Sequence, residues 1–412
     1  MPGWTEATSR AIKIYSRLSD DVVVDIMGYN WNDRRTLFQC ALVCRQWARA
    51  TRSVLFRTVF LGGPSGRLQL CSRLEKSELG SWIKELRIGG WRNFWQLWTK
   101  FYNPLMPKLE NLRRLTVDLT CGIPADAFTL EEQADLTCKL SQCHTIEQLT
   151  FTNGAMVSPH CVLFFTRCLP GLRTLVLDDC DVYILFYQAP SVAVPFGRSP
   201  QLTCLRIPYA YQNIASLFSQ ETLFSLETLE IGNWLASLLH PSNALYVLNN
   251  LGPELSTLSL DCFTSGSKVH AQGSSVMSRI EKLGVEDIPK KLHDILYGWD
   301  VDRLIGLRTL RIGFMDHVPL RQFLPILLCK LRHLHLKTIS VCLSFDTATE
   351  FNEKNYHSLG MSLAVLINQS SLERVRVEYL GSLPLQQAQD ELLHALRPFA
   401  TRGFKLMFTR AT

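Results

Sequence analysis

The 412-residue sequence predicts a mixed α/β fold, with a small helical module at the amino terminus followed by a long array of strand-and-helix repeats. Two observations favour this fold class. A short apolar pattern recurs along most of the chain, whereas the first sixty residues carry apolar side chains at helical spacing. Because a Gly- and Pro-rich stretch lies between the two parts, the predicted boundaries are 1–60 for the module, 61–80 for a linker and 81–412 for the repeats.

The repeated pattern is Leu-x-x-Leu-x-Leu, with Ile, Val or Phe also allowed at the apolar positions. Its eleven copies begin at Ile83, Leu112, Ile146, Leu172, Leu202, Leu226, Leu255, Ile280, Leu307, Leu331 and Leu372. The second and third apolar residues of each copy are two apart, so both point to the same face of a strand. Segments of helical spacing, such as residues 244–252, lie between the copies. A strand and a helix in each repeat stack into a solenoid with one continuous core.

This pattern resembles the leucine-rich-repeat family over about residues 80–410. The resemblance implies a horseshoe lined by a curved parallel sheet. The family often places Asn or Cys three positions after the last apolar strand residue, and among these copies Cys180 fits that rule. We therefore expect an irregular horseshoe of about eleven repeats.

The second half of the helical module raises a packing problem. If residues 37–56 form one helix, an apolar stripe runs along one side of it. That stripe comprises Leu37, Cys40, Ala41, Cys44, Trp47, Ala48 and Thr51. Leu42 and Val43 fall outside the stripe, and a module of about fifty residues is too small to cover both sides of such a helix. A helix is also predicted earlier, beginning at Ser19.

These two segments together resemble the F-box family over about residues 15–60. Leu18, Val22 and Ile26 occupy the apolar positions of that family's first half. The family's Leu-Val-Cys-(Lys/Arg)-x-Trp core is present as Leu42, Val43, Cys44, Arg45 and Trp47, whereas Ser19 stands where the family usually has Pro. The resemblance implies a trihelical module that binds a Skp-type adaptor and thereby a cullin–RING ubiquitin ligase. The residues expected to bind the adaptor are Leu18, Val22, Ile26, Leu42, Val43, Cys44 and Trp47.

An F-box joined to leucine-rich repeats implies the substrate-recognition subunit of an SCF-type ligase, whose repeats bind a client protein. One alternative is a leucine-rich-repeat scaffold whose helices only cap the repeats and engage no ligase. Another is an enzyme with its site on the curved face. The sequence contains no phosphate-binding loop, no His-Glu-x-x-His motif and no Gly-x-Ser-x-Gly motif. We expect a binding protein with no catalytic residue, cofactor or metal.

The last three repeat copies carry basic residues at the positions that flank the inward-pointing pair. These are Arg311, His333, His335, Lys337, Arg374 and Arg376. Because Arg side chains bind carboxylates and phosphates through two hydrogen bonds, this patch is a candidate site for an acidic or phosphorylated client segment. The alternative is an ordinary solvated strand face.

Composition limits the class of partner and the compartment. A net charge of +6 is small for this length, so we expect neither a nucleic-acid nor a membrane partner. The thirteen cysteines are odd in number and irregularly spaced, which is typical of a reducing compartment. We expect a cytoplasmic or nuclear protein.

Overall fold

The computed structural model describes residues 18–62, 74, 78–89, 105–118, 138, 140–154, 159–180, 201–207, 223, 225–232, 241–260, 287–313, 326–331, 334–344, 363, 372–380, 383–396 and 405–410. The chain divides into two compact units. The first comprises residues 1–118 and 128–147, and the second comprises residues 119–127 and 148–412.

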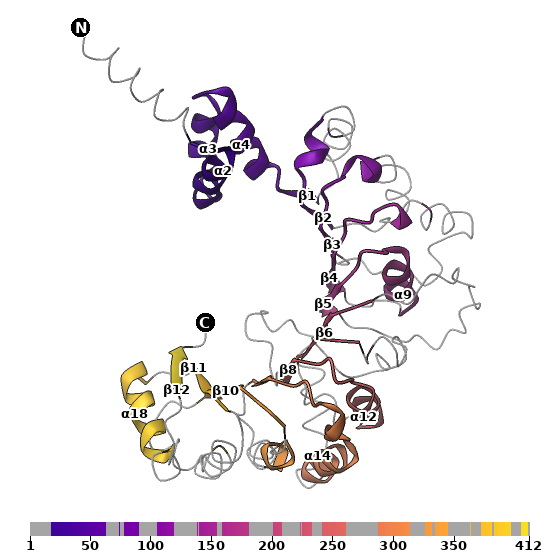
Figure 1. Cartoon of the computed structure of the whole chain (residues 1–412), viewed down its shortest axis with the longest axis vertical. Helices are drawn as coiled ribbons and strands as arrows, with labels where there is room; N and C mark the ends of the chain where they lie inside the picture. The colour runs from indigo at the N-terminus through magenta and orange to yellow at the C-terminus, as the bar shows by residue number, and fades with distance from the viewer. Residues whose placement is uncertain are drawn as a thin grey trace. The chain divides into compact units, whose positions relative to one another are not determined.

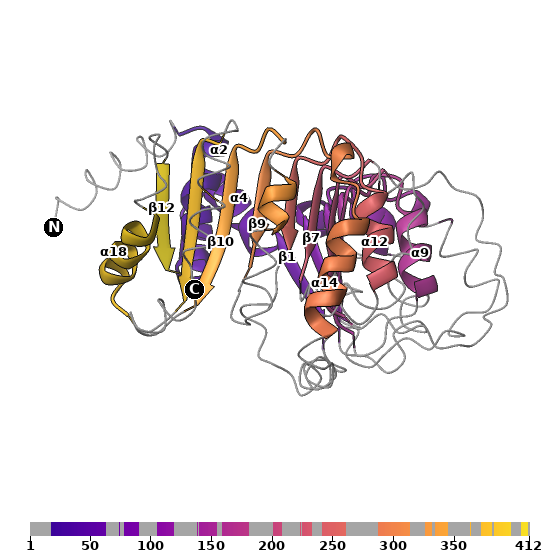
Figure 2. The same ribbon diagram turned by 90° about the horizontal axis from the view of Figure 1, so that it is seen from below.

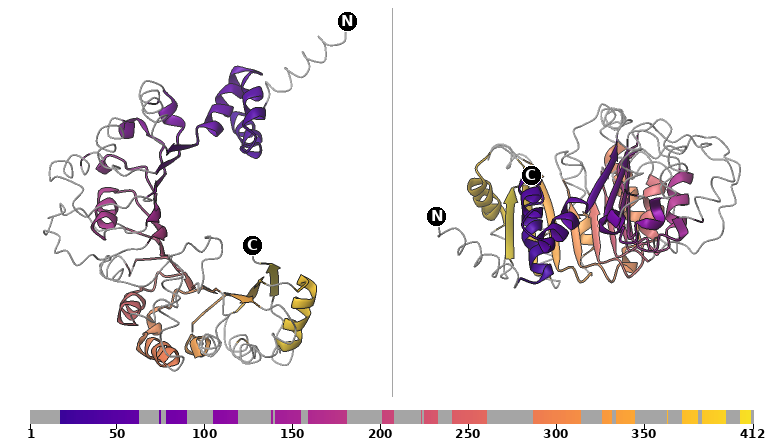
Figure 3. Two further views of the ribbon diagram at one scale, coloured as in Figure 1. Left: turned by 180° about the vertical axis from the view of Figure 1, so that it is seen from behind. Right: turned by 90° about the horizontal axis from the view of Figure 1, so that it is seen from above.

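The described part of the first unit begins with three helices, which are α2 (Asp20–Tyr29), α3 (Arg34–Ala41) and α4 (Arg45–Leu55). They pack against one another as a small cluster, drawn in indigo in Figure 3. Strands β1 (Thr58–Gly62), β2 (Glu85–Gly89) and β3 (Arg114–Asp118) follow, with short 3-10 turns at Glu78–Trp82 and Met106–Lys108. The three strands pair in parallel in chain order.

The second unit is built on strands that also pair in parallel in chain order. They are β4 (Gln148–Gly154), β5 (Thr174–Cys180), β6 (Cys204–Ile207), β7 (Thr228–Ile231), β8 (Thr257–Leu260), β9 (Thr309–Ile312), β10 (Thr338–Ser344), β11 (Arg374–Leu380) and β12 (Lys405–Arg410). The helices in its described residues are α9 (Pro159–Cys168), α12 (Pro241–Asn249), α14 (Asp287–Gly298) and α18 (Leu385–Leu396), with a 3-10 turn at Val301–Arg303. Figures 1 and 2 show α9, α12 and α14 on one face of the strands. We call the opposite face of this sheet the open face.

The repeated apolar pattern predicts the strands closely. Nine of the eleven copies form a strand that begins two residues after the first apolar position. In the copy at Leu307, for example, Leu307, Leu310 and Ile312 are all buried. The three apolar positions of a copy therefore build the core between the strands and the helices, and the residues between them reach the open face.

The copy at Leu331 does not fit the prediction. The strand expected at Leu331 begins instead at Thr338, where Leu336, Ile339 and Val341 supply the same buried pattern five residues later. The prediction was wrong here because two overlapping apolar patterns compete, and the β-branched residues at 338–341 favour the later one.

The residues of the Ile280 copy lie outside those that the structure describes. Thr257 of β8 nevertheless pairs directly with Thr309 of β9, so no strand lies between β8 and β9.

The two outermost strands, β1 and β12, were not predicted as repeats. β1 fits the pattern through Phe56, Val59 and Leu61, but its residues were assigned to the module and the linker. The predicted linker thus begins inside a strand, since Leu61 and Gly62 belong to β1. In β12, the register with β11 places Gly403 at the first apolar position, so no pattern was visible there.

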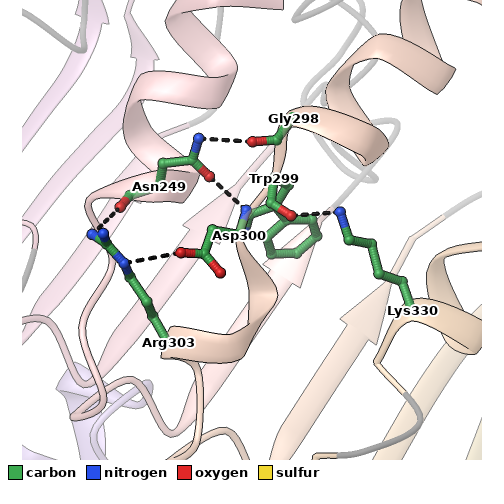
Figure 4. Close-up of polar contacts among 6 residues, drawn as sticks. All are labelled: Asn249, Gly298, Trp299, Asp300, Arg303 and Lys330. Carbon is green, nitrogen blue, oxygen red and sulfur yellow. Dashed lines mark hydrogen bonds and ion pairs between the residues drawn. The ribbon is translucent and has the colours of Figure 1, made fainter.

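Hydrogen bonds connect α12 to the end of α14 on the helical side of the second unit (Figure 4). The Asn249 side chain donates to the Gly298 carbonyl at 2.9 Å and accepts from the Asp300 backbone N–H at 2.8 Å. Lys330 donates to the Trp299 carbonyl at 2.5 Å, and burial lowers the pKa of this ammonium group against the opposing effect of Asp300. These side chains satisfy backbone groups at a helix end, which is a structural role.

Candidate functional site

Exposed apolar side chains gather on the three-helix module. Eight of the fifteen large exposed hydrophobic residues in the described parts of the chain lie between residues 22 and 43. These eight are Val22, Val24, Ile26, Tyr29, Trp31, Phe38, Leu42 and Val43. We call them the exposed apolar surface. A concentration of this kind on a small folded module is typical of a protein interface.

The module has a complete core of its own beneath this surface. Val23, Met27, Leu37 and Ala50 are buried together, and Thr51 donates to the Met27 sulfur at 3.6 Å. The exposed residues are therefore surplus to the fold. This finding answers the packing problem posed by Leu42 and Val43, because those side chains remain exposed when the helices are packed.

The structure divides the seven predicted adaptor-binding residues into two groups. Five of them are exposed, namely Val22, Ile26, Leu42, Val43 and Cys44. Leu18 and Trp47 instead lie half-buried and pack against the core. The core face of α2 is formed by Val23 and Met27, so Val22 and Ile26 lie outside the core.

The single helix expected over residues 37–56 is two helices. The chain leaves α3 at Leu42, and Cys44 is fully extended, with φ −162° and ψ 171°. The break lets Leu37 from α3 and Thr51 from α4 reach the same core while Leu42 and Val43 point to solvent. Leu42 is 86% exposed, the highest value for an aliphatic residue among the large exposed hydrophobics.

Polar caps fix the starts of α2 and α3. As predicted, Ser19 caps α2, accepting a hydrogen bond from the Val22 backbone N–H at 3.4 Å. Asp33 caps α3 through the Thr36 backbone N–H at 3.1 Å, and hydrogen bonds from the Thr36 hydroxyl and N–H hold the pKa of the Asp33 carboxyl below its usual value. These caps define where the two helices begin, and therefore where their exposed side chains lie.

Val24, Tyr29, Trp31 and Phe38 were not predicted as site residues and are the other members of the exposed apolar surface. A signal was available, since aromatic residues in so short a module have little core to occupy. Arg45, Arg49 and Arg52 are exposed on α4 at helical spacing and add positive charge to the same module.

The basic client patch is smaller than predicted. Arg311, Arg374 and Arg376 lie on β9 and β11 at positions that face away from the core, as expected. His335 and Lys337 precede β10 and so do not lie on the strand face, and Lys337 forms an ion pair with Glu373 at 3.2 Å. His333 lies outside the described residues.

Glu378 neutralises part of the remaining patch. Its carboxylate lies 3.0 Å from the Arg311 guanidinium and 3.6 Å from that of Arg376. Arg311 reaches across β10 at Ser340, a small side chain that is buried. The register pairs Arg374 with Lys405 of β12, so two basic residues are neighbours on adjacent strands. Glu378 therefore offsets part of the positive charge that Arg311 and Arg376 bring to the open face.

No group of three or more His, Cys, Asp or Glu side chains that could hold a metal ion occurs in the described residues. Within the same residues, no helix is both long and apolar enough to cross a membrane.

A comparison with protein-family models matches residues 16–62 to the F-box-like domain. The matched range includes all three helices of the module and β1. A search of curated proteins gave no match to the chain. The three-helix module and its exposed apolar surface therefore belong to an F-box-like domain at residues 16–62.

Proposed function

We propose that this protein is the client-recognition subunit of an SCF-type cullin–RING ubiquitin ligase and is not itself an enzyme. In this proposal a Skp-type adaptor binds the exposed apolar surface, and a client protein binds the open face of the second unit. The observation that carries the proposal is that the F-box-like domain has a complete core and still exposes Leu42, Val43, Val22 and Ile26.

An adaptor interface explains the exposed apolar surface better than a cap on the repeats does. Exposed aliphatic and aromatic side chains gain free energy when a partner removes them from water, at about 25 cal/mol per Å² of apolar area. The exposed arginines of α4 can form the polar rim that surrounds the apolar centre of most interfaces. Leu42, as the most exposed aliphatic residue among them, is the expected centre of binding energy.

The proposed repeat class is the leucine-rich repeat. Parallel strands in chain order support it, as do the buried apolar triplets, such as Leu226, Leu229 and Ile231, and the helices on one face. An array of this kind presents a long strand face whose residues can vary without disturbing the core. That property suits client recognition, and the reducing compartment expected from the cysteines is the cytoplasm or nucleus.

The proposed client segment is acidic or phosphorylated and binds around Arg374. Arg311 and Arg376 share Glu378, so their charge is partly neutralised, whereas Arg374 lies beside Lys405 in the register. Guanidinium groups bind carboxylate and phosphate groups through charge-assisted hydrogen bonds, and Glu378 competes with such a ligand for Arg311 and Arg376.

The adaptor proposal is tested with the full chain and a purified Skp-type adaptor, by measuring the dissociation constant. Leu42→Asp should weaken binding by at least about thirtyfold, because it places a charge at the expected centre of the interface. Ile305→Asp is the matched control, since Ile305 is also an exposed aliphatic residue but lies in the second unit. Its affinity should equal that of the wild type.

A folded wild-type chain that does not bind the adaptor would overturn the proposal and favour the scaffold alternative. Equal losses in Leu42→Asp and Ile305→Asp would also count against it, because the effect would then not depend on the exposed apolar surface.

A further inference from the structure

The exposed apolar surface comes from two segments that are separate in the sequence. Val22 and Ile26 lie on α2, whereas Leu42 and Val43 lie just before α4. A partner that contacts both segments binds more tightly when they are held in one fixed arrangement before it arrives. Gln46, in the first turn of α4, is placed to provide that restraint.

The Gln46 side chain joins the start of α4 to the start of α2. Its Nε2 donates to the Leu18 carbonyl oxygen at 2.9 Å and to Asp20 Oδ1 at 2.7 Å. Both partners are acceptors, so the amide nitrogen must face them. The first carbonyl that α2 uses is that of Ser19, which accepts from Val23, so the Leu18 carbonyl obtains its hydrogen bond from outside the helix.

Gln46 adds a restraint to a segment that is also held by the Ser19 cap and by the packing of Leu18 against the core. Ser19 has φ −66° and ψ 155°, and a proline would fix φ at about this value through its ring. A serine can leave this conformation freely, and its own cap bond to Val22 is long, at 3.4 Å. Gln46 bonds to Leu18 and Asp20, the residues on both sides of Ser19. It therefore restrains the backbone conformation at Ser19 that a proline ring would have fixed.

We propose that Gln46 is a positioning residue that holds α2 against α4, and thereby aligns the two halves of the exposed apolar surface for the adaptor. The proposal rests on adaptor binding as the proposed function. Gln46 itself is half-buried and acts through its hydrogen bonds to Leu18 and Asp20.

Three substitutions at one position test this role in the full chain, with adaptor affinity as the readout. Gln46→Ala removes both hydrogen bonds and should weaken binding by about five- to tenfold. Gln46→Glu keeps the length but turns an oxygen toward two acceptors, so it should weaken binding further. Gln46→Lys keeps a donor at the end of a long side chain and should bind within about threefold of the wild type.

Gln386→Ala is the matched control, because Gln386 also donates to an aspartate, Asp390, but on α18. It should leave adaptor affinity unchanged. Circular dichroism of each variant shows whether the helices remain folded, and the Lys and Glu variants retain side-chain length if Gln46→Ala fails to fold. The expected order of affinity is wild type, Lys, Ala and Glu.

If Gln46→Ala and Gln46→Glu bind the adaptor as tightly as the wild type does, the positioning role is overturned and the proposed function still stands. Equal loss in the Lys and Glu variants would overturn it too, since the donor would then be irrelevant. Absence of adaptor binding by the folded wild type would overturn the proposed function and this role together.

Discussion

The three-helix module and the strands of the second unit differ in where they leave apolar side chains. In the module, eight large hydrophobic residues between 22 and 43 are exposed. In the nine strands of the second unit, Met407 alone among the described side chains is a large exposed hydrophobic residue. The open face instead carries hydroxyl groups and paired charges, such as Arg206 with Glu230.

This difference indicates two kinds of recognition. An apolar surface on a small rigid module suits one constant partner, because affinity comes from burying area. A face of polar and charged side chains suits selection among partners, because unpaired or like charges penalise the wrong one. The proposed function accordingly assigns the constant partner to the module and client selection to the open face.

The largest expected effect is on the stability of the module, and it differs between a core leucine and a surface leucine. Leu37 is buried and Leu42 is exposed, although they are five residues apart. Leu37→Ala should lower the free energy of unfolding of the module by about 2–5 kcal/mol, because it opens a cavity. Leu42→Ala should change it by less than about 0.5 kcal/mol. Urea denaturation followed by circular dichroism measures both, and similar losses would contradict the assignment of Leu42 to the surface.

The next effect compares two glycines, one in each region. A Cβ at Gly306 would lie 1.8 Å from the Pro253 carbonyl oxygen, whereas a Cβ at Gly28 would meet no heavy atom within 4 Å. Gly306→Ala should therefore destabilise the repeats by about 1–3 kcal/mol through overpacking. Gly28→Ala, in α2, should stabilise the module by about 0.5–1 kcal/mol. Melting temperatures that shift in the same direction would contradict this contrast.

The smallest effect concerns charge on the open face. Glu378→Gln removes the negative charge shared by Arg311 and Arg376, whose side chains are 40% and 48% exposed, so the stability loss should stay below about 1 kcal/mol. It should nevertheless strengthen retention on a heparin column, an immobilised polyanion, because positive charge on this face rises.

Glu373→Gln is the control for that measurement, since it changes the net charge by the same amount. Glu373 pairs with Lys337, and that ion pair lies away from the strands. Arg374→Glu should weaken retention. If Glu378→Gln and Glu373→Gln elute at the same salt concentration, the position of the charge has no effect and the client site is not centred on this face.

Most strands were predictable because each needs only a local pattern. Leu307, Leu310 and Ile312 point inward whichever repeat precedes them, and nine copies obey the same rule. The rule failed where two patterns overlapped, at Leu331 and Leu336, and where Gly403 replaces the first apolar residue before β12. Local pattern alone does not decide between competing registers; pairing with a neighbouring strand does.

The sequence predicted several residues of the candidate site, but not which of them are exposed and which are buried. Leu42, Val43 and Cys44 were identified by their motif, and the structure exposes all three. Trp47 belongs to the same motif and yet packs against the core. On the open face, Glu378 lies four residues from Arg374 in the sequence, but its partner Arg311 lies on another repeat, so the neutralising contact was invisible.

The sequence by itself determined that the chain has a helical module and a parallel strand array, because apolar spacing repeats within each. Tertiary structure alone decided which side of α2 is the core. Val22 with Ile26 and Val23 with Met27 are both apolar pairs four residues apart, so helical spacing allows either pair inside. The extended backbone at Cys44 brings α4 back against α3, and the core they form accepts Val23 and Met27. Val22 and Ile26 are left exposed for a partner to cover.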